Sequence, residues 1–484
     1  EPRAATLVDA VATRLQVVVI ELKADEDAQE IFETLNARGT PLTAADLIKN
    51  LVFQRLNASP PVAERAYHQY WEQFETPFWE KEVQSGRVIW SRSSLFLTQW
   101  LTSQTRQDIP AREVFASFKR FVDDSALPIT DMLEHIRACA ATYRALLEGS
   151  QDRHKPLDLL ERFTYRSNVM QSEIVKPIVI LLTDPTLPSV PQEQLEVGLN
   201  AIESWLVRRM LVRAVSAGTN RFLIDLLGQI ALVDRAELGT RILEILAEQV
   251  SDVSYWPDDE AVRRSLESLP AYRRLSRGRL RMVLEAIEDH RRGFGDPARR
   301  AKGEQPVVRE ECTIEHVMPQ KWGQHWPLPS EVTSHDRDAI IHTLGNLTLV
   351  SKALNPSLSN ASWEGPQGKR ATLGAYSSIK LTADAIARAD ADGKGWDEIL
   401  IVERTQSMIE DILRVWPTPP GHTNEGRFGM AGSNEVTVRD LIAAGLLTAG
   451  QKLVSSNGSD PEAFATVNAD GLLEVEGRFY DSPS

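Results

Sequence analysis

Two neighbouring stretches of sequence organise the chain, residues 311–322 (ECTIEHVMPQKW) and residues 344–360 (LGNLTLVSKALNPSLSN). The first places an acid, Glu315, directly before a histidine, His316. The second carries three asparagines, of which Asn346 and Asn355 are the candidate site residues. Carboxylate and amide oxygens are ligands for hard divalent ions, and a neutral histidine can act as a general base. The two stretches therefore predict one divalent metal, Mg²⁺ or Mn²⁺, next to one base.

Hydrolysis of a phosphodiester suits these residue types. The attacking water must lose a proton, and the charge that develops on the phosphate must be stabilised. His316 is the candidate base, whereas Glu315 and the side-chain oxygen of Asn355 are the candidate metal ligands. Asn346 follows a glycine and is expected to fix the loop that carries the histidine. Adjacent strand residues point to opposite faces, so Glu315 and His316 can converge only at a strand end or a bulge.

Charge is unevenly distributed along the chain. The 484 residues carry a net charge of −14, which argues against a protein that coats nucleic acid over its whole surface. Residues 272–302, however, contain ten Lys and Arg against four Asp and Glu. We expect this basic segment to contact the DNA backbone, with Arg279 and Arg281 as candidates, together with Lys369 and Arg370 further along the chain.

The rest of the chain predicts a mainly α protein with small α+β parts. Residues 15–23 (LQVVVIELK) have the composition of a buried strand, and Thr43 with Asp46 predicts a capping box at a helix start. From about 56 to 270, apolar residues recur at helical spacing, with proline-containing breaks between the segments. The pair Arg208-Arg209 is expected on the solvated face of one of these helices.

Membrane, disulfide and zinc chemistry are not expected. The longest apolar runs, such as VVVIEL (17–22), are too short to span a bilayer. Two cysteines give no disulfide framework and no zinc knuckle, which fits a reducing cytoplasm. Four of the nine histidines fall between 316 and 342, but a zinc site would need cysteine partners or tighter histidine spacing. His325, His335 and His342 are therefore expected in loops or at the surface.

The C-terminal part divides into a linker and a small unit. Residues 417–435 are rich in Pro, Gly, Asn and Ser, which is typical of a linker. After them, a short helix is expected at Arg439–Ala444. Short strands should follow, joined by turns at Asn457-Gly458 and Asp470-Gly471.

Three segments in order carry a resemblance to a known family: IEHVMP (314–319), LGNLTL (344–349) and LNxxLSN (354–360). They resemble the HNH (His-Me finger, ββα-metal) nuclease domain of GmrSD-type modification-dependent restriction enzymes, and the resemblance covers roughly 272–416. The stretch IFETLNARGTPLTAADLIKNLVF (31–53) is similar to the later part of the ParB-like NTPase domain that precedes the nuclease in that family. SspE proteins share this layout.

The resemblance implies roles for individual residues. His316 matches the general base of the family, Glu315 its acidic ligand, Asn346 its central asparagine and Asn355 its late asparagine ligand. The Asp-Gly-Gln-Gln-Arg motif that binds nucleotide in the family is absent from this sequence. Asn36, Arg38 and Gly39 are therefore assigned only to remnant walls of a nucleotide pocket. The last 50 or so residues resemble a RAMA domain, a module fused to restriction enzymes and adenine methylases.

Together these observations predict a metal-dependent DNA endonuclease of a bacterial anti-phage restriction system. The expected architecture is a helical scaffold joined to a ββα-metal nuclease domain. The expected domains are 1–55 (part of the NTPase domain), 56–270 (scaffold), 271–416 (nuclease), 417–435 (linker) and 436–484 (partial RAMA-like domain). Double-stranded DNA is the expected partner, NTP could bind the incomplete N-terminal domain, and a homo-oligomer is compatible with the sequence. The alternative is a non-catalytic sensor of modified DNA or an NTP-regulated component of such a system.

Overall fold

The structure is a computed structural model, in which the chain is described mainly between residues 42 and 424. Within this range the gaps are 57–59, 87, 295–299, 302, 359 and 394. Outside it, the described residues are 13–14, 447–448, 450–454, 464–467, 473–475 and 478–480. The strand expected at 15–23, the helix expected at Arg439–Ala444 and both expected glycine turns lie outside the described residues.

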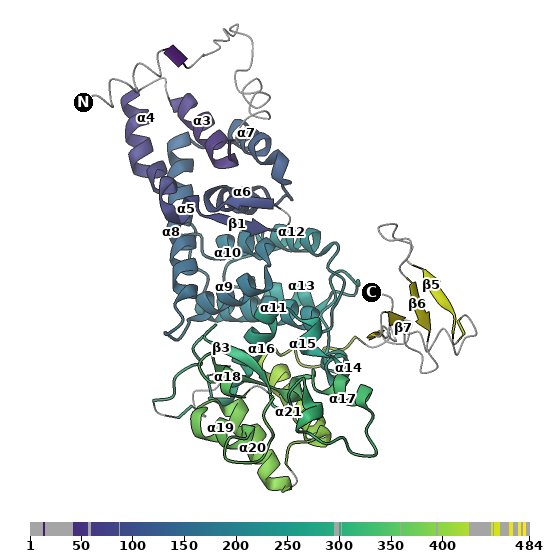
Figure 1. The fold of residues 1–484 in the computed structure, drawn as a ribbon. Helices are drawn as coiled ribbons and strands as arrows, with labels where there is room; N and C mark the ends of the chain where they lie inside the picture. The colour runs from purple at the N-terminus through teal and green to yellow at the C-terminus, as the bar shows by residue number, and fades with distance from the viewer. Residues whose placement is uncertain are drawn as a thin grey trace.

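The described fold is mainly helical with small sheets, as the sequence predicts. The first part, residues 44–268, is a stack of helices that we call the helical scaffold (Figure 1). Its helices are α3 (Ala44–Leu56), α4 (Pro60–Ala66), α5 (Pro77–Glu80), α6 (Arg92–Thr105), α7 (Val114–Asp124), α8 (Ile129–Gln151), α9 (Leu159–Met170), α10 (Lys176–Leu182), α11 (Gln192–Leu211), α12 (Thr219–Ile230), α13 (Leu238–Ala247) and α14 (Asp259–Ser268).

Short elements complete the scaffold. A two-stranded antiparallel hairpin, β1 (Glu82–Ser85) and β2 (Val88–Ser91), was not expected from the sequence. The short helical turns are η1 (Tyr67–Trp71), η2 (Glu72–Glu75), η3 (Ala111–Glu113) and η4 (Glu173–Val175). Among the described residues, no helix combines the length and the apolar character needed to cross a membrane.

Local signals explain where the helices begin. The capping box predicted at Thr43 is confirmed, because Thr43 Oγ1 accepts from the Asp46 N–H and Asp46 Oδ2 accepts from the Thr43 N–H. Asp158 and Glu161 form a second box at the start of α9. Such boxes satisfy N–H groups that a helix N-terminus leaves without partners. The expected proline breaks are also present, since Pro128 precedes α8 and Pro191 precedes α11.

The second part, residues 271–416, packs below the scaffold in Figure 1, and we call it the hairpin unit. It contains one antiparallel hairpin, β3 with β4, surrounded by helices. Its elements are α15 (Ala271–Arg274), α16 (Arg277–Arg291), β3 (Cys312–His316), η5 (Trp322–Gln324), α17 (Ser334–Ile340), η6 (Leu344–Asn346), β4 (Leu347–Ser351), α18 (Asn355–Leu358), α19 (Lys369–Tyr376), α20 (Lys380–Asp392) and α21 (Glu398–Val415).

One hydrophobic core joins the scaffold to the hairpin unit. It combines Val207 and Leu211 of α11 with residues of the hairpin and of α21 such as Leu347 and Met408. The end of α21 is also fixed by polar contacts to α11, since Trp416 Nε1 donates to Glu203 Oε1 at 2.7 Å. The scaffold therefore holds the hairpin unit through packing as well as hydrogen bonds.

Arg208 and Arg209 do not lie on a solvated face, contrary to the expectation. Arg208 is fully buried, and its guanidinium donates to the carbonyl of Trp416 at 2.6 Å and to Asp259 Oδ1 at 2.8 Å. Arg209 is also buried, and it donates to three backbone carbonyls. The helix is apolar on most sides, so its spacing alone did not show which face the arginines occupy.

The C-terminal described segments form a four-stranded antiparallel sheet, which lies beside the rest of the molecule in Figure 1. Its strands are β5 (Lys452–Val454), β6 (Phe464–Val467), β7 (Leu473–Val475) and β8 (Arg478–Tyr480), paired in chain order. The expected short strands are therefore confirmed.

Gly345 permits a close contact between the hairpin and α21. A Cβ at this position would lie 1.9 Å from the carbonyl oxygen of Ile401 and 2.8 Å from the backbone nitrogen of Thr405. The Gly345 N–H itself donates to Thr405 Oγ1 at 3.0 Å. Only a residue without a side chain lets these two backbones approach so closely.

We expect Gly345→Ala to destabilise the protein by about 3 kcal/mol, because the added methyl group meets backbone atoms that cannot rotate away. Gly323→Ala is the matched control, since a Cβ there meets nothing within 4 Å. Urea unfolding would measure both variants. Equal midpoints for the two would show that the close packing at Gly345 is not needed.

Candidate active site

The β3–β4 hairpin carries the residues singled out from the sequence. Glu315 pairs with Thr348 and His316 pairs with Leu347 in a regular antiparallel register. His316 is the last residue of its strand. Position at a strand end agrees with the sequence argument, but the ladder remains regular through both residues, so their side chains leave on opposite faces.

The side-chain amide of Asn346 clamps the chain that leaves His316. Its Oδ1 accepts from the Met318 N–H at 2.8 Å and from Trp396 Nε1 at 3.0 Å. Its Nδ2 donates to the carbonyl oxygens of Met318, at 2.8 Å, and Ile341, at 2.9 Å. These four bonds use both N–H groups and both lone pairs of the amide. Asn346 is fully buried, so in this arrangement it positions the loop and has no polar atom left for a substrate.

His316 lies in a buried cluster of three rings. Its Nε2 is 3.2 Å from Nδ1 of His342, close enough for one ring to donate and the other to accept. The ring of Tyr272 meets His316 edge-on at a centroid distance of 4.3 Å and stacks on His342 at 5.9 Å. His342 lies in the turn after α17, as the expectation of a loop position had it, but it is 2% exposed, so the alternative of a surface position is wrong.

Burial keeps both imidazoles neutral. It is the main reason why the pKa of His316 falls to about 3, and the neighbouring His342 adds to the effect. Burial likewise lowers the pKa of His342 to about 4, with Arg273 the next contributor. At pH 7 each neutral ring therefore has one nitrogen that carries a lone pair and no proton. That is the state that a proton acceptor requires.

Positive charge borders this cluster. Arg273 and Arg277 are exposed, and their charges contribute to the low pKa of both histidines. The Arg277 guanidinium lies over the Tyr272 ring, 3.4 Å from its centroid. Exposed guanidinium groups next to a neutral imidazole form a surface that suits a phosphate group, since arginine binds phosphate with paired hydrogen bonds.

Glu315 has a different partner from His316. Its Oε1 accepts from the Lys369 ammonium at 2.5 Å, and the same ammonium donates to the backbone oxygen of His316 at 2.5 Å. Lys369 is fully buried, so its ammonium is not presented at the surface, where a DNA contact was expected. Burial raises the pKa of Glu315 and lowers that of Lys369, and the mutual attraction of the pair opposes both shifts.

The donor atoms expected for a metal fit a divalent ion in type, but one of them is already paired. Glu315 and Asn355 would offer a carboxylate and an amide oxygen, the ligands that Mg²⁺ takes from proteins in small number. Asn355 is the partly buried first residue of α18. The Lys369 ammonium, however, already neutralises Glu315. A metal would share this carboxylate with Lys369 or displace it.

The other expected DNA contacts lie in different settings. Arg370 is exposed and forms a two-bond ion pair with Asp390, at 2.6 and 3.0 Å. Arg279 donates to the Met170 carbonyl at 2.7 Å, and Arg281 lies 3.7 Å from Glu285. The three residues of the expected nucleotide pocket, Asn36, Arg38 and Gly39, fall outside the described residues.

A group with metal-ligand side chains lies elsewhere, in the scaffold. His135, Cys139 and Asp184 offer ligand atoms within 4.8 Å of one another. His135 Nε2 and Asp184 Oδ2 are 2.8 Å apart, a hydrogen-bond distance. Burial is also the main reason why the Cys139 thiol has a raised pKa. His135 and Cys139 come from α8, and Asp184 lies just after the end of α10, so the three residues do not belong to the hairpin.

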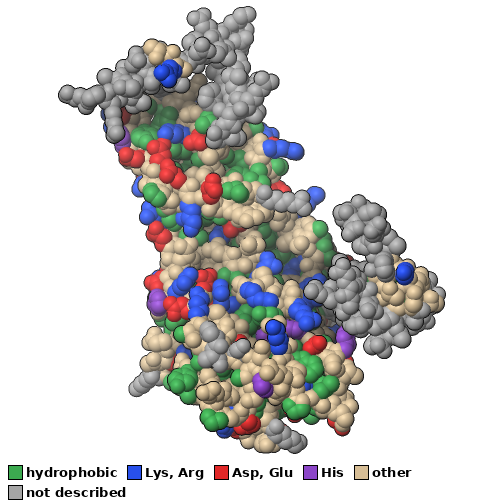
Figure 2. All heavy atoms as spheres, viewed as in Figure 1, with side chains coloured by type: hydrophobic (Ala, Val, Ile, Leu, Met, Phe, Trp, Pro, Cys, Tyr) green, Lys and Arg blue, Asp and Glu red, His purple; other side chains and the backbone are tan. Residues whose placement is uncertain are grey.

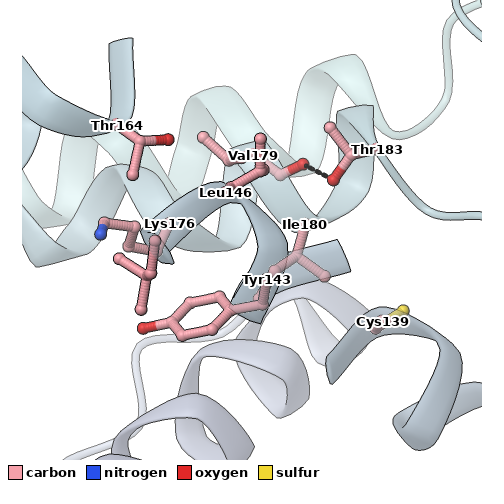
Figure 3. A pocket seen from close by; sticks show the side chains of 9 residues that line it. Cys139, Tyr143, Leu146, Thr164, Lys176, Val179, Ile180 and Thr183 are labelled. Carbon is pink, nitrogen blue, oxygen red and sulfur yellow. Dashed lines mark hydrogen bonds between the residues drawn. The ribbon is translucent and has the colours of Figure 1, made fainter. Parts of the chain in front are cut away.

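A small cavity next to Cys139 is a packing feature. Figure 3 shows Lys176 and Tyr143 among the side chains that line it. Its volume of about 10 Å³ is room for about one water molecule. The buried Lys176 ammonium already donates to Asn168 Oδ1 at 2.5 Å. This cavity is too small for a substrate.

Comparison with known proteins connects the hairpin to one family. Residues 256–411 match the model for the C-terminal domain of GmrSD restriction endonucleases. Residues 3–53 match the model for the N-terminal domain of the same enzymes. No curated protein matches the chain significantly. The chain thus carries segments similar to both domains of a GmrSD restriction endonuclease, and that similarity implies DNA cleavage in restriction.

The sequence did not single out part of this site, namely His342, Tyr272, Arg273 and Arg277. A signal was present for two of them, because Arg273 and Arg277 are four residues apart inside the basic segment. The contact between α15 and the hairpin is long-range, and a single sequence does not reveal it. The Tyr272 N–H donates to the His342 carbonyl at 3.0 Å, which fixes that contact.

The histidine pair gives a prediction for stability against pH. Both folded pKa values, about 3 and about 4, lie below the ordinary 6.5, so the unfolded chain binds more protons between pH 4 and 6.5. Stability is therefore complete above pH 6.5 and falls on acidification, by up to about 1.4 kcal/mol per pH unit for each histidine.

The free energy of unfolding should fall less steeply between pH 6.5 and 4.5 in His342→Phe than in wild type. The difference is the contribution of one histidine, up to about 1.4 kcal/mol per pH unit. Denaturant unfolding in EDTA measures the slope, and His325→Phe is the control, since His325 is exposed. Parallel curves for wild type and His342→Phe would contradict the burial of a neutral pair.

Proposed function

We propose that the hairpin unit is a His-Me finger (HNH) nuclease that hydrolyses DNA phosphodiester bonds, with His316 as the general base. The observation that carries the proposal is the setting of His316, a neutral imidazole held by the Asn346 clamp and bordered by Arg273 and Arg277. The match to the C-terminal domain of GmrSD restriction endonucleases supports the same reaction.

The arrangement of the two histidines suggests how a proton would move. If His316 Nε2–H donates to His342 Nδ1, the lone pair of His316 lies on Nδ1. That nitrogen takes the proton of the attacking water, and the hydrogen bond to His342 supports the imidazolium that forms. Arg273 and Arg277 hold the phosphate and offset its developing charge.

Glu315 and Asn355 are the residues that would hold a divalent ion, Mg²⁺ or Mn²⁺. Bound there, the ion supplies Lewis-acid stabilisation to the phosphate and the leaving oxygen. Because Glu315 is paired with Lys369, this role requires that Lys369 share or release the carboxylate. The side chains of Glu315 and His316 also leave opposite faces of β3. The geometry therefore supports the base role of His316 more than the ligand role of Glu315.

One observation favours a second function, a DNA-binding sensor that does not cut. The buried Lys369 ammonium already compensates the one carboxylate proposed as a metal ligand. If that pair persists, the hairpin unit would bind DNA through its arginines without metal-assisted hydrolysis. Metal-dependent cleavage would indicate the nuclease, whereas DNA binding without cleavage would indicate the sensor.

The remaining assignments extend this proposal to the rest of the chain. We propose a partial NTPase domain at 1–55, a scaffold at 56–270, the nuclease at 271–416, a linker at 417–435 and a RAMA-like unit at 436–484. Such a protein would act on double-stranded DNA in the cytoplasm, which agrees with two free buried cysteines. Regulation by NTP and assembly into a homo-oligomer belong to the same proposal.

Plasmid nicking tests the proposed function. Wild-type protein should nick supercoiled DNA with Mg²⁺ or Mn²⁺ and not in EDTA, and His316→Ala should lose at least about a hundredfold in rate, the usual contribution of a general base. His325→Ala is the matched control because His325 lies in the same unit and is exposed.

Two results would count against the nuclease. Metal-dependent nicking that survives His316→Ala would remove His316 from the base role. DNA binding without nicking by wild type, with every metal tested, would favour the sensor.

A further inference from the structure

An open groove of about 760 Å³ lies on the scaffold side of the hairpin unit. Its walls run from Gln99 of α6 past Arg213, after the end of α11, to Ser276 before α16, and we call it the scaffold groove. The family match to the C-terminal domain begins at residue 256, so the walls from α6 and α11 lie outside it. No pattern in the sequence indicates this groove.

Charge on the walls of the scaffold groove is mainly positive. Its lining includes four guanidinium groups against two carboxylates, although the whole chain carries −14. The arginines are Arg209, Arg213, Arg274 and Arg279. Figure 2 shows Lys and Arg side chains gathered on the face near the junction of the scaffold and the hairpin unit. A positive concave surface on an acidic protein attracts anions locally.

The groove and the histidine cluster share one helical turn, α15. α15 is one helical turn, and within it Tyr272 packs on His316 while Arg274 lines the groove. Between them, Arg273 contributes its charge to His316. Residues two apart on a helix point to roughly opposite sides, so the groove and the histidine cluster lie on two sides of the same helical turn, α15.

We propose that the scaffold groove holds the sugar–phosphate backbone of the DNA that flanks the bond to be cut. This inference rests on the proposed nuclease function and adds a second binding surface to it. Charged contacts of this kind position the DNA and do not read its sequence. Uncharged polar groups such as Thr98, Gln171 and Asn220 also line the walls and can bond to phosphate or sugar oxygens.

A free nucleotide offers the same phosphate chemistry, and a volume of this size is within the range of small-molecule sites. The DNA backbone is the better occupant because the groove is open and reaches Arg274 of α15, the helical turn whose Tyr272 packs on His316. A free nucleotide is therefore one arm of the test.

Arg213 and Arg274 are the residues to change. Arg213 has φ of 55°, in the left-handed region that glycine adopts without strain, so Arg213→Gly removes the charge and suits the backbone. Arg274 is exposed on α15, and Arg274→Gln keeps most of its length. Arg65→Gln is the matched control, because Arg65 is exposed on α4 and is not among the residues that line the groove.

Fluorescence anisotropy with a labelled 30-base-pair duplex, in EDTA to prevent cleavage, measures affinity against salt concentration. The plot of log K for DNA association against log salt has a negative slope, and each lost phosphate contact should make it shallower by about 0.9. The same loss should weaken binding roughly eightfold at 0.1 M salt. Both single variants should show this change, and Arg65→Gln should match wild type. Circular dichroism checks that each variant is folded.

Unchanged slopes in both groove variants would overturn the proposal. It would also be overturned if calorimetry shows deoxyadenosine monophosphate binding that Arg274→Gln abolishes, while the duplex affinity stays at the wild-type value. The nuclease proposal is tested separately, because His316→Ala should bind the duplex as wild type does. If wild type does not nick DNA but the groove variants change the salt dependence, the nuclease proposal fails and the groove proposal holds. If wild type nicks DNA but the groove variants bind as wild type does, the groove proposal fails.

Discussion

The four hydrogen bonds of the Asn346 side chain are the constraint on which the site depends. They join the chain after His316 to the loop before β4 and to Trp396, next to the start of α21. A buried amide is stable only when its donors and acceptors are paired, so this arrangement favours one conformation of the loop. Gly345 allows α21 to come close enough for it, and Arg404 crosslinks the same region by donating to the Leu347 carbonyl at 2.9 Å. The position of His316 is therefore set by the core of the hairpin unit.

Electrostatics divides this small region into two parts. On one side, buried neutral histidines face exposed arginines, an arrangement that suits proton transfer next to a phosphate. On the other side, Glu315 and Lys369 form a buried ion pair, which is costly to break because either charge would be left alone. The base and the expected metal ligand therefore have separate environments. An account with one shared centre must explain how Lys369 gives up or shares its partner.

Features that depend on neighbouring residues were predictable from the sequence. The Thr43 capping box, the proline breaks, the strand around His316 and the loop-fixing role of Asn346 follow from local spacing and turn chemistry. The burial of His342 and Lys369 and the approach of Tyr272 were not predictable, because each depends on segments far apart in the chain. The same limit explains why the sequence points to Arg279, whereas Arg273 and Arg277 are the arginines whose charges reach the histidines. The spacing of apolar residues shows that a helix has an apolar face, but not which other segment of the chain packs against that face.

Chemical rescue tests the base role of His316 most directly. Replacing His316 with glycine removes the imidazole, and free imidazole can then enter and accept the proton in its place. The account predicts that His316→Gly binds DNA normally, cleaves very slowly, and regains rate as imidazole is added, with saturation. A wild-type rate in His316→Gly without imidazole would contradict the account. So would a slow variant, folded and bound to DNA, in which imidazole restores nothing.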